Sequence, residues 1–162
     1  MVHAFNDLEG LRIAAEMEKR GHEYYRRAAK LSKSPEAVDM LLFLAEDESR
    51  HQAEFQRLSA RILDKHAEAA DYSMEASAYL SAIAAEIIFT DGLIATAKKH
   101  GFDNPRAILE GAIESEKDSI LFYAELERLT QDDESRAVFA EIGRQERGHM
   151  SQLMHMLSRI DE

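Results

Sequence analysis

The chain has 162 residues, no cysteine, only two prolines, and a formal net charge of −11 that arises from 31 acidic and 20 basic side chains. This length fits a single domain, residues 1–162, and the acidic surface argues against nucleic acid as a partner. The lack of cysteine excludes disulfides, thiolate zinc sites, iron–sulfur clusters and cysteine nucleophiles, so any metal must be held by oxygen and nitrogen.

The first predicted elements form a helical hairpin over residues 5–66. Apolar or small residues recur at helical spacing from Leu8 to Ala28, which predicts a helix over residues 5–31. Ser34 and Pro35 then supply an N-cap and a first helical position, so a second helix is predicted to begin there. Its inward stripe comprises Leu41, Leu44, Ala45, Phe55, Leu58 and Ile62.

The next segment, residues 67–104, is too long for a tight turn and fits a crossover along the full length of a bundle. Such a crossover makes the second and third helices parallel. An apolar stripe within it, from Tyr79 to Ile88, predicts a short helix packed on the bundle or on a second subunit. No apolar run reaches the roughly 20 residues of a membrane span, and residues 1–10 do not resemble an export signal. A cytoplasmic protein without membrane contact is therefore expected.

A second hairpin is predicted over residues 105–160. Asn104 and Pro105 resemble the start of a helix, and a polar break over residues 130–133 separates the third helix from the fourth. The inward residues of the third helix are Leu109, Ala112, Ile113, Ile120, Tyr123 and Leu126. Those of the fourth are Phe139, Ile142, Leu153, Met156, Leu157 and Ile160. The sequence thus predicts an all-α four-helix bundle of two antiparallel hairpins joined by a long crossover.

The second helix of each hairpin contains a Glu-x-x-His motif, a spacing that places carboxylate and imidazole on one helical face. A shift of 98 positions carries the first motif onto the second and also superposes a further glutamate and tyrosine. The matched pairs are Glu48 with Glu146, His51 with His149, Glu18 with Glu116, and Tyr25 with Tyr123. An ungapped internal repeat of this kind indicates two equivalent halves.

Position relative to the turns predicts that the repeated acids lie in one layer. Glu18 and Glu48 are equally far from Lys33 in the first turn, and Glu116 and Glu146 are equally far from the second turn. Residues of an antiparallel hairpin at equal distance from its turn lie level with each other. Four carboxylates and two imidazoles are therefore predicted to point into one layer of the core.

The neighbouring acids Glu16 and Glu114 lie about 200° around their helices, on charged faces. Solvated helix charges are the usual interpretation of a lone glutamate, but four buried carboxylates without Lys or Arg partners would each cost several kcal/mol to desolvate. Two divalent cations would balance four negative charges, so we predict a dinuclear metal site. Its oxygen-rich ligand set suits iron first and manganese second, rather than tetrahedral zinc.

These motifs give the chain a resemblance to the ferritin-like superfamily, specifically the rubrerythrin-related di-iron proteins, over nearly its whole length. The matching segments are Glu18 with Tyr25, residues 44–51, Glu116 with Phe122 and Tyr123, and residues 146–149. The resemblance implies two iron ions per chain, with Glu48 and Glu146 as bridging carboxylates. The implied ligands are Glu18, Glu48, His51, Glu116, Glu146 and His149.

Two departures from full-length rubrerythrins weaken a peroxidase assignment. Those proteins carry a rubredoxin domain with four cysteine ligands, and they have an additional glutamate where this chain has Ser119. The leading expectation is a di-iron oxidoreductase that reduces peroxide or oxygen with electrons from an external donor such as a rubredoxin-like protein. The alternatives are a ferritin-like protein for iron oxidation, handling or storage, and a helical interaction module with a vestigial metal site. A homodimer formed through the crossover stripe is expected.

Residues around the predicted site leave several roles open. Tyr25 and Tyr123 are expected to hydrogen-bond ligand carboxylates, to quench stray oxidising equivalents, or to serve as ordinary core tyrosines. Glu86 in the crossover is a further carboxylate within possible reach of the site. The histidines without repeat partners are interpreted as surface residues: His3, His22, His66, His100 and His155. The methionines Met150, Met154 and Met156 are interpreted as core filler.

Overall fold

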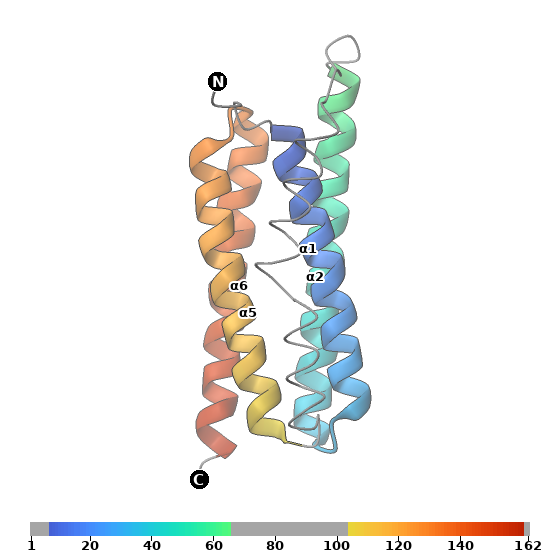
Figure 1. The fold of residues 1–162 in the computed structure, drawn as a ribbon, viewed down its shortest axis with the longest axis vertical. Helices are drawn as coiled ribbons and strands as arrows, with labels where there is room; N and C mark the ends of the chain where they lie inside the picture. Colours follow the sequence, from blue (N-terminus) through green and yellow to red (C-terminus); the bar gives the residue numbers. More distant parts are fainter. Residues whose placement is uncertain (1–6, 66–103, 161–162) are drawn as a thin grey trace.

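The computed structural model describes residues 7–65 and 104–160, which form four α-helices and contain no β-strand. The helices are α1 (Asp7–Leu31), α2 (Pro35–Lys65), α5 (Pro105–Leu129) and α6 (Asp133–Ile160). Helix α1 packs antiparallel to α2, and α5 packs antiparallel to α6 (Figure 1). The hairpins lie side by side with α2 and α5 running in the same direction, so the predicted all-α four-helix bundle is confirmed.

Several predictions for the crossover lie outside the described residues. These include its short helix, Glu86 and His100, and the same holds for His66 at the end of the predicted first hairpin and His3 near the start of the chain. The homodimer interface assigned to the crossover stripe therefore stays a prediction. Within the described helices, no segment has the length and hydrophobicity of a membrane span.

Most residues of the inward stripes predicted from the sequence lie in the core or pack against it. Ile120 of α5 is only half-buried and lies outside the core cluster, and the other exceptions lie near the end of α6. Met150 and Met156 pack against the core as predicted. Ile160 is 45% exposed and Met154 is 53% exposed, so the prediction that they lie inward is wrong. Ile160 is the last residue of α6, and Met154 lies about 100° around the helix from the buried Leu153.

The predicted helix starts are confirmed by their hydrogen bonds. The Ser34 hydroxyl accepts from the Ala37 backbone N–H at 3.3 Å, and Asn104 Oδ1 accepts from the Arg106 N–H at 3.1 Å. Helix α6 has a cap that the sequence analysis did not identify. The Asp132 carboxylate accepts from the backbone N–H and the hydroxyl of Ser135, at 2.9 and 2.7 Å.

The cap at Asp132 also connects the two hairpins, because Arg61 of α2 donates to the same carboxylate. Burial would raise the pKa of Asp132, but the hydrogen bonds from Ser135 and Arg61 outweigh it and lower the pKa to about 2. Asp132→Ala should lower the free energy of unfolding by about 1 kcal/mol, as loss of an N-cap commonly does. Denaturant unfolding measures this, with Glu127→Ala as a surface control expected to stay within about 0.5 kcal/mol. Equal losses in both variants would contradict the assigned cap.

Candidate metal centre

The structure brings all six predicted ligand residues into one buried layer between the hairpins. Helix α1 contributes Glu18, α5 contributes Glu116, and α2 and α6 each contribute one Glu-x-x-His motif. Each of the six residues is between 1 and 4% exposed. Glu16 and Glu114, by contrast, are exposed, as their helical positions predicted.

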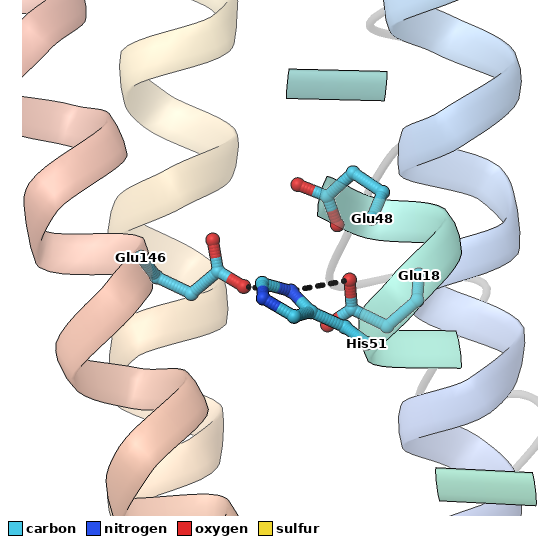
Figure 2. A group of neighbouring side chains, drawn as sticks. All are labelled: Glu18, Glu48, His51 and Glu146. Carbon is cyan, nitrogen blue, oxygen red and sulfur yellow. Dashed lines mark ion pairs between the residues drawn. The ribbon is translucent and has the colours of Figure 1, made fainter. Parts of the chain in front are cut away.

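The potential ligand atoms fall into two overlapping groups, in each of which the atoms lie within 4.8 Å of one another. The first group, named here the His51 position, contains Glu18, Glu48, His51 and Glu146 (Figure 2). The second, named the His149 position, contains Glu48, Glu116, Glu146 and His149. Glu48 and Glu146 belong to both groups, which is the placement that bridging carboxylates require.

Both imidazoles turn their Nδ1 atoms toward the carboxylates. His51 Nδ1 lies 2.9 Å from Glu146 Oε1 and 3.3 Å from Glu18 Oε2 (Figure 2). His149 Nδ1 lies 2.9 Å from Glu146 Oε2 and 3.9 Å from Glu116 Oε2. The two rings stack with centroids 5.9 Å apart and planes inclined by 20°. The layer therefore has one imidazole nitrogen for each of the two positions.

Unsatisfied polar atoms at the centre of the layer fit a bound cation. His51 Nδ1, Glu18 Oε2 and Glu146 Oε1 are buried without a hydrogen-bond partner among the described residues. The two contacts drawn in Figure 2 join these atoms at ion-pair distances but without hydrogen-bond geometry. Buried acceptors left without a donor cost free energy, and a cation between them would satisfy all three atoms. Four carboxylates and two imidazoles form a donor set that suits iron or manganese.

The outward-facing nitrogens contact two residues that the sequence analysis missed. His51 Nε2 lies 2.9 Å from Gln145 Oε1, and His149 Nε2 lies 3.1 Å from Asp47 Oδ2. The Gln145 amide N–H₂ donates to Glu141 at 2.8 Å, so its oxygen faces His51. Amide and carboxylate oxygens only accept, so each Nε2 carries a proton, and Nδ1 is the nitrogen whose lone pair would be free for a metal once a cation displaces its proton.

Both predicted tyrosines donate hydrogen bonds to carboxylates of the opposite hairpin. The Tyr25 hydroxyl donates to Glu116 Oε1 at 2.5 Å, and the Tyr123 hydroxyl donates to Glu18 Oε1. Burial raises the pKa of both phenols well above the usual value. The negative charge of the neighbouring carboxylate, Glu116 for Tyr25 and Glu18 for Tyr123, raises it further. Both hydroxyls therefore keep their protons. Of the three roles considered for these tyrosines, the hydrogen bond to a carboxylate fits these contacts.

Without a cation, bound protons offset the repulsion between the buried carboxylates. Burial raises the pKa of Glu48 and Glu116 well above the usual value, and the neighbouring carboxylates raise both pKa values further. Burial alone would lower the pKa of His51, but Glu146 and Glu18 outweigh it and raise the pKa to about 11. The pKa of Glu146 is lowered to about 2, because His149 and His51 outweigh the effect of its burial. A divalent cation would replace protons held in this layer.

Two unmatched histidines fall within the described residues. His155 is exposed, as predicted. His22 is not a simple surface residue, because it is half-buried and its Nδ1 lies 2.7 Å from the backbone oxygen of Ala45. This contact connects α1 to α2 one turn after Glu18.

Two antiparallel helical hairpins with four glutamates and two histidines buried between them define a ferritin-like bundle with a buried, carboxylate-rich cluster that could hold metal. The sequence model of the Rubrerythrin family matches residues 9–157, and the chain belongs to this family. Comparisons with curated proteins and with solved structures gave no match. Members of the rubrerythrin family typically bind iron, and the Glu/His cluster is compatible with a di-iron site.

Proposed function

We propose that this chain is a di-iron oxidoreductase that reduces hydrogen peroxide or oxygen with electrons from an external donor. The observation that carries the proposal is the pair of overlapping, buried donor groups that share Glu48 and Glu146. We assign one iron to the His51 position and one to the His149 position. Manganese suits the same oxygen-rich donors and is the second choice of metal.

Iron at the two positions would supply the two electrons that, together with two protons from solvent, reduce one hydrogen peroxide to two water molecules. The protein would contribute charge balance, because four glutamates offset the charge of two divalent cations. Tyr25 and Tyr123 would hold Glu116 and Glu18 in place while keeping their own protons. The burial of all six residues would limit access of water to the reacting centre.

The source of electrons in this proposal lies outside the chain. The 162 residues include no cysteine to bind a rubredoxin iron, and they contain no Gly-rich nucleotide-binding fingerprint. Once oxidised, the centre would therefore depend on another protein, such as one resembling rubredoxin, or on a small reductant.

Mixing the anaerobic, Fe(II)-loaded protein with one equivalent of peroxide should give one prompt oxidation and then arrest. The reason is that the two ferrous ions hold only the two electrons that one peroxide consumes. Stopped-flow absorbance measures the reaction, and a rubredoxin-like donor added in a second mixing step should restore turnover. Absence of a prompt phase would contradict the proposal. Continued oxidation of excess Fe(II), with iron accumulating far above two per chain, would instead support the storage alternative.

A further inference from the structure

The 98-residue repeat extends to the two residues that contact the outer nitrogens of the histidines. The shift that carries His51 onto His149 also carries Asp47 onto Gln145. The contacts cross between the hairpins, because Asp47 of α2 contacts His149 of α6 and Gln145 of α6 contacts His51 of α2. The two halves of the centre therefore match in geometry and differ in charge, with a carboxylate behind one imidazole and a neutral amide behind the other.

Arg50 holds the Asp47 carboxylate in place behind His149 but neutralises only part of its negative charge. Asp47 is 16% exposed, and its second oxygen, Oδ1, accepts from Arg50 Nη1 at 2.5 Å. The Arg50 side chain is 64% exposed, so water screens much of its positive charge. In the second half of the repeat Gly148 corresponds to Arg50, so no arginine is present there. The Gln145 amide instead donates to Glu141. Each acceptor is thus held in place by its own helix.

We propose that the carboxylate of Asp47 and the neutral amide of Gln145 make the two metal positions unequal, so that the His149 position binds a divalent metal first and more tightly than the His51 position. A carboxylate that accepts the Nε2 proton makes an imidazole a stronger ligand than a neutral amide does, and it adds negative charge near the cation. Asp47 and Gln145 act here as positioning residues. The inference rests on the proposed metal centre, and it adds a loading order that the six ligands alone do not specify.

Titration of the metal-free protein with Mn(II) under anaerobic conditions, in competition with a chromogenic chelator, tests this order. The native protein should bind two equivalents in separate steps, with affinities that differ by about 10- to 100-fold, the usual effect of an outer partner. Asp47→Asn keeps an acceptor but removes the charge, so its two steps should converge. Gln145→Glu should strengthen the weaker step. The double variant D47N/Q145E should restore two separate steps with their order reversed.

Crystals that contain one equivalent of Mn(II) identify the occupied position directly. The anomalous signal should lie beside His149 in the native protein and beside His51 in D47N/Q145E. Equal steps in the native protein, or a signal that stays beside His149 in the double variant, would overturn the inference while leaving the metal centre intact. A native protein that binds no Mn(II) and no Fe(II) would overturn both the inference and the proposed function. Gln145→Glu alone decides the question if Asp47→Asn fails to fold, since an unchanged second step contradicts the proposed charge effect.

Discussion

Replacing Glu48 by alanine should remove both metals from the chain, whereas replacing Glu16 should remove neither. Glu48 belongs to both donor groups, so its loss takes one ligand from each metal position. The affinity at both positions should fall by more than the roughly 10- to 100-fold that loss of an outer partner costs. Metal analysis of protein loaded anaerobically with Fe(II) and passed through a desalting column measures the remaining metal per chain.

Two further variants separate the bridging role from a general loss of structure. Glu48→Gln keeps the size of the side chain and should also deplete both positions, while helical circular dichroism should stay unchanged. Glu18→Ala removes a ligand that belongs only to the His51 position, so it should weaken mainly one metal. Equal metal losses in Glu16→Ala and Glu48→Ala would show that the assigned ligand face is wrong.

The metal-free protein should lose stability above about pH 6.5, and the stabilisation gained from Mn(II) should grow as the pH rises. The pKa of His51 is raised from 6.5 to about 11, so its contribution is complete below pH 6.5 and is lost as the pH rises toward 11. The raised pKa values of Glu48 and Glu116 act in the same direction, since only the folded state retains their protons above pH 4.5. The lowered pKa of Glu146 matters below pH 4.5, where its contribution is lost as the pH falls through 2.

Thermal unfolding with chelator and with excess Mn(II), at about pH 5.5 and about pH 8, measures this difference. Metal at a hundredfold excess over its dissociation constant stabilises by about 2.7 kcal/mol, and proton competition makes that excess harder to reach at the lower pH. Glu114→Ala should show the same difference in melting temperature between the Mn(II) and chelator samples as the native protein. Glu146→Gln should largely abolish this difference in melting temperature at both pH values. If Mn(II) raised the melting temperature less at the higher pH than at the lower pH, a centre that exchanges protons for metal would be contradicted.

Much of the fold was predictable because helical periodicity and caps are local signals. Ser34 and Asn104, each followed by a proline, accept hydrogen bonds from backbone N–H groups two or three residues further along the chain. The Asp132 cap was missed, because four polar residues in succession, from Thr130 to Asp133, do not show which of them is the cap. Ile160 is the last residue of α6, and periodicity within a helix does not reveal which residues at its end find a packing partner.

The layer of six ligand residues was predictable because the repeat and the distance from each turn are properties of the sequence. Asp47 and Gln145 were missed even though each lies next to a predicted ligand. Within its own helix each residue resembles a surface side chain, and its histidine partner lies on a helix of the other hairpin. A contact of that kind depends on the packing of the two hairpins. Matching the residues that adjoin each motif across the 98-position shift would have identified them as a pair.

The occupancy of the two positions is the most direct test of the proposed centre. Crystals of the protein loaded anaerobically with Fe(II) should show two anomalous peaks at the iron edge, about 3.5–4 Å apart, as is common in two-metal sites. Glu48 and Glu146 should lie between the peaks, with His51 beside one and His149 beside the other. A single peak, peaks confined to surface carboxylates, or an empty layer in fully reduced, iron-saturated crystals would contradict a di-iron centre in this chain.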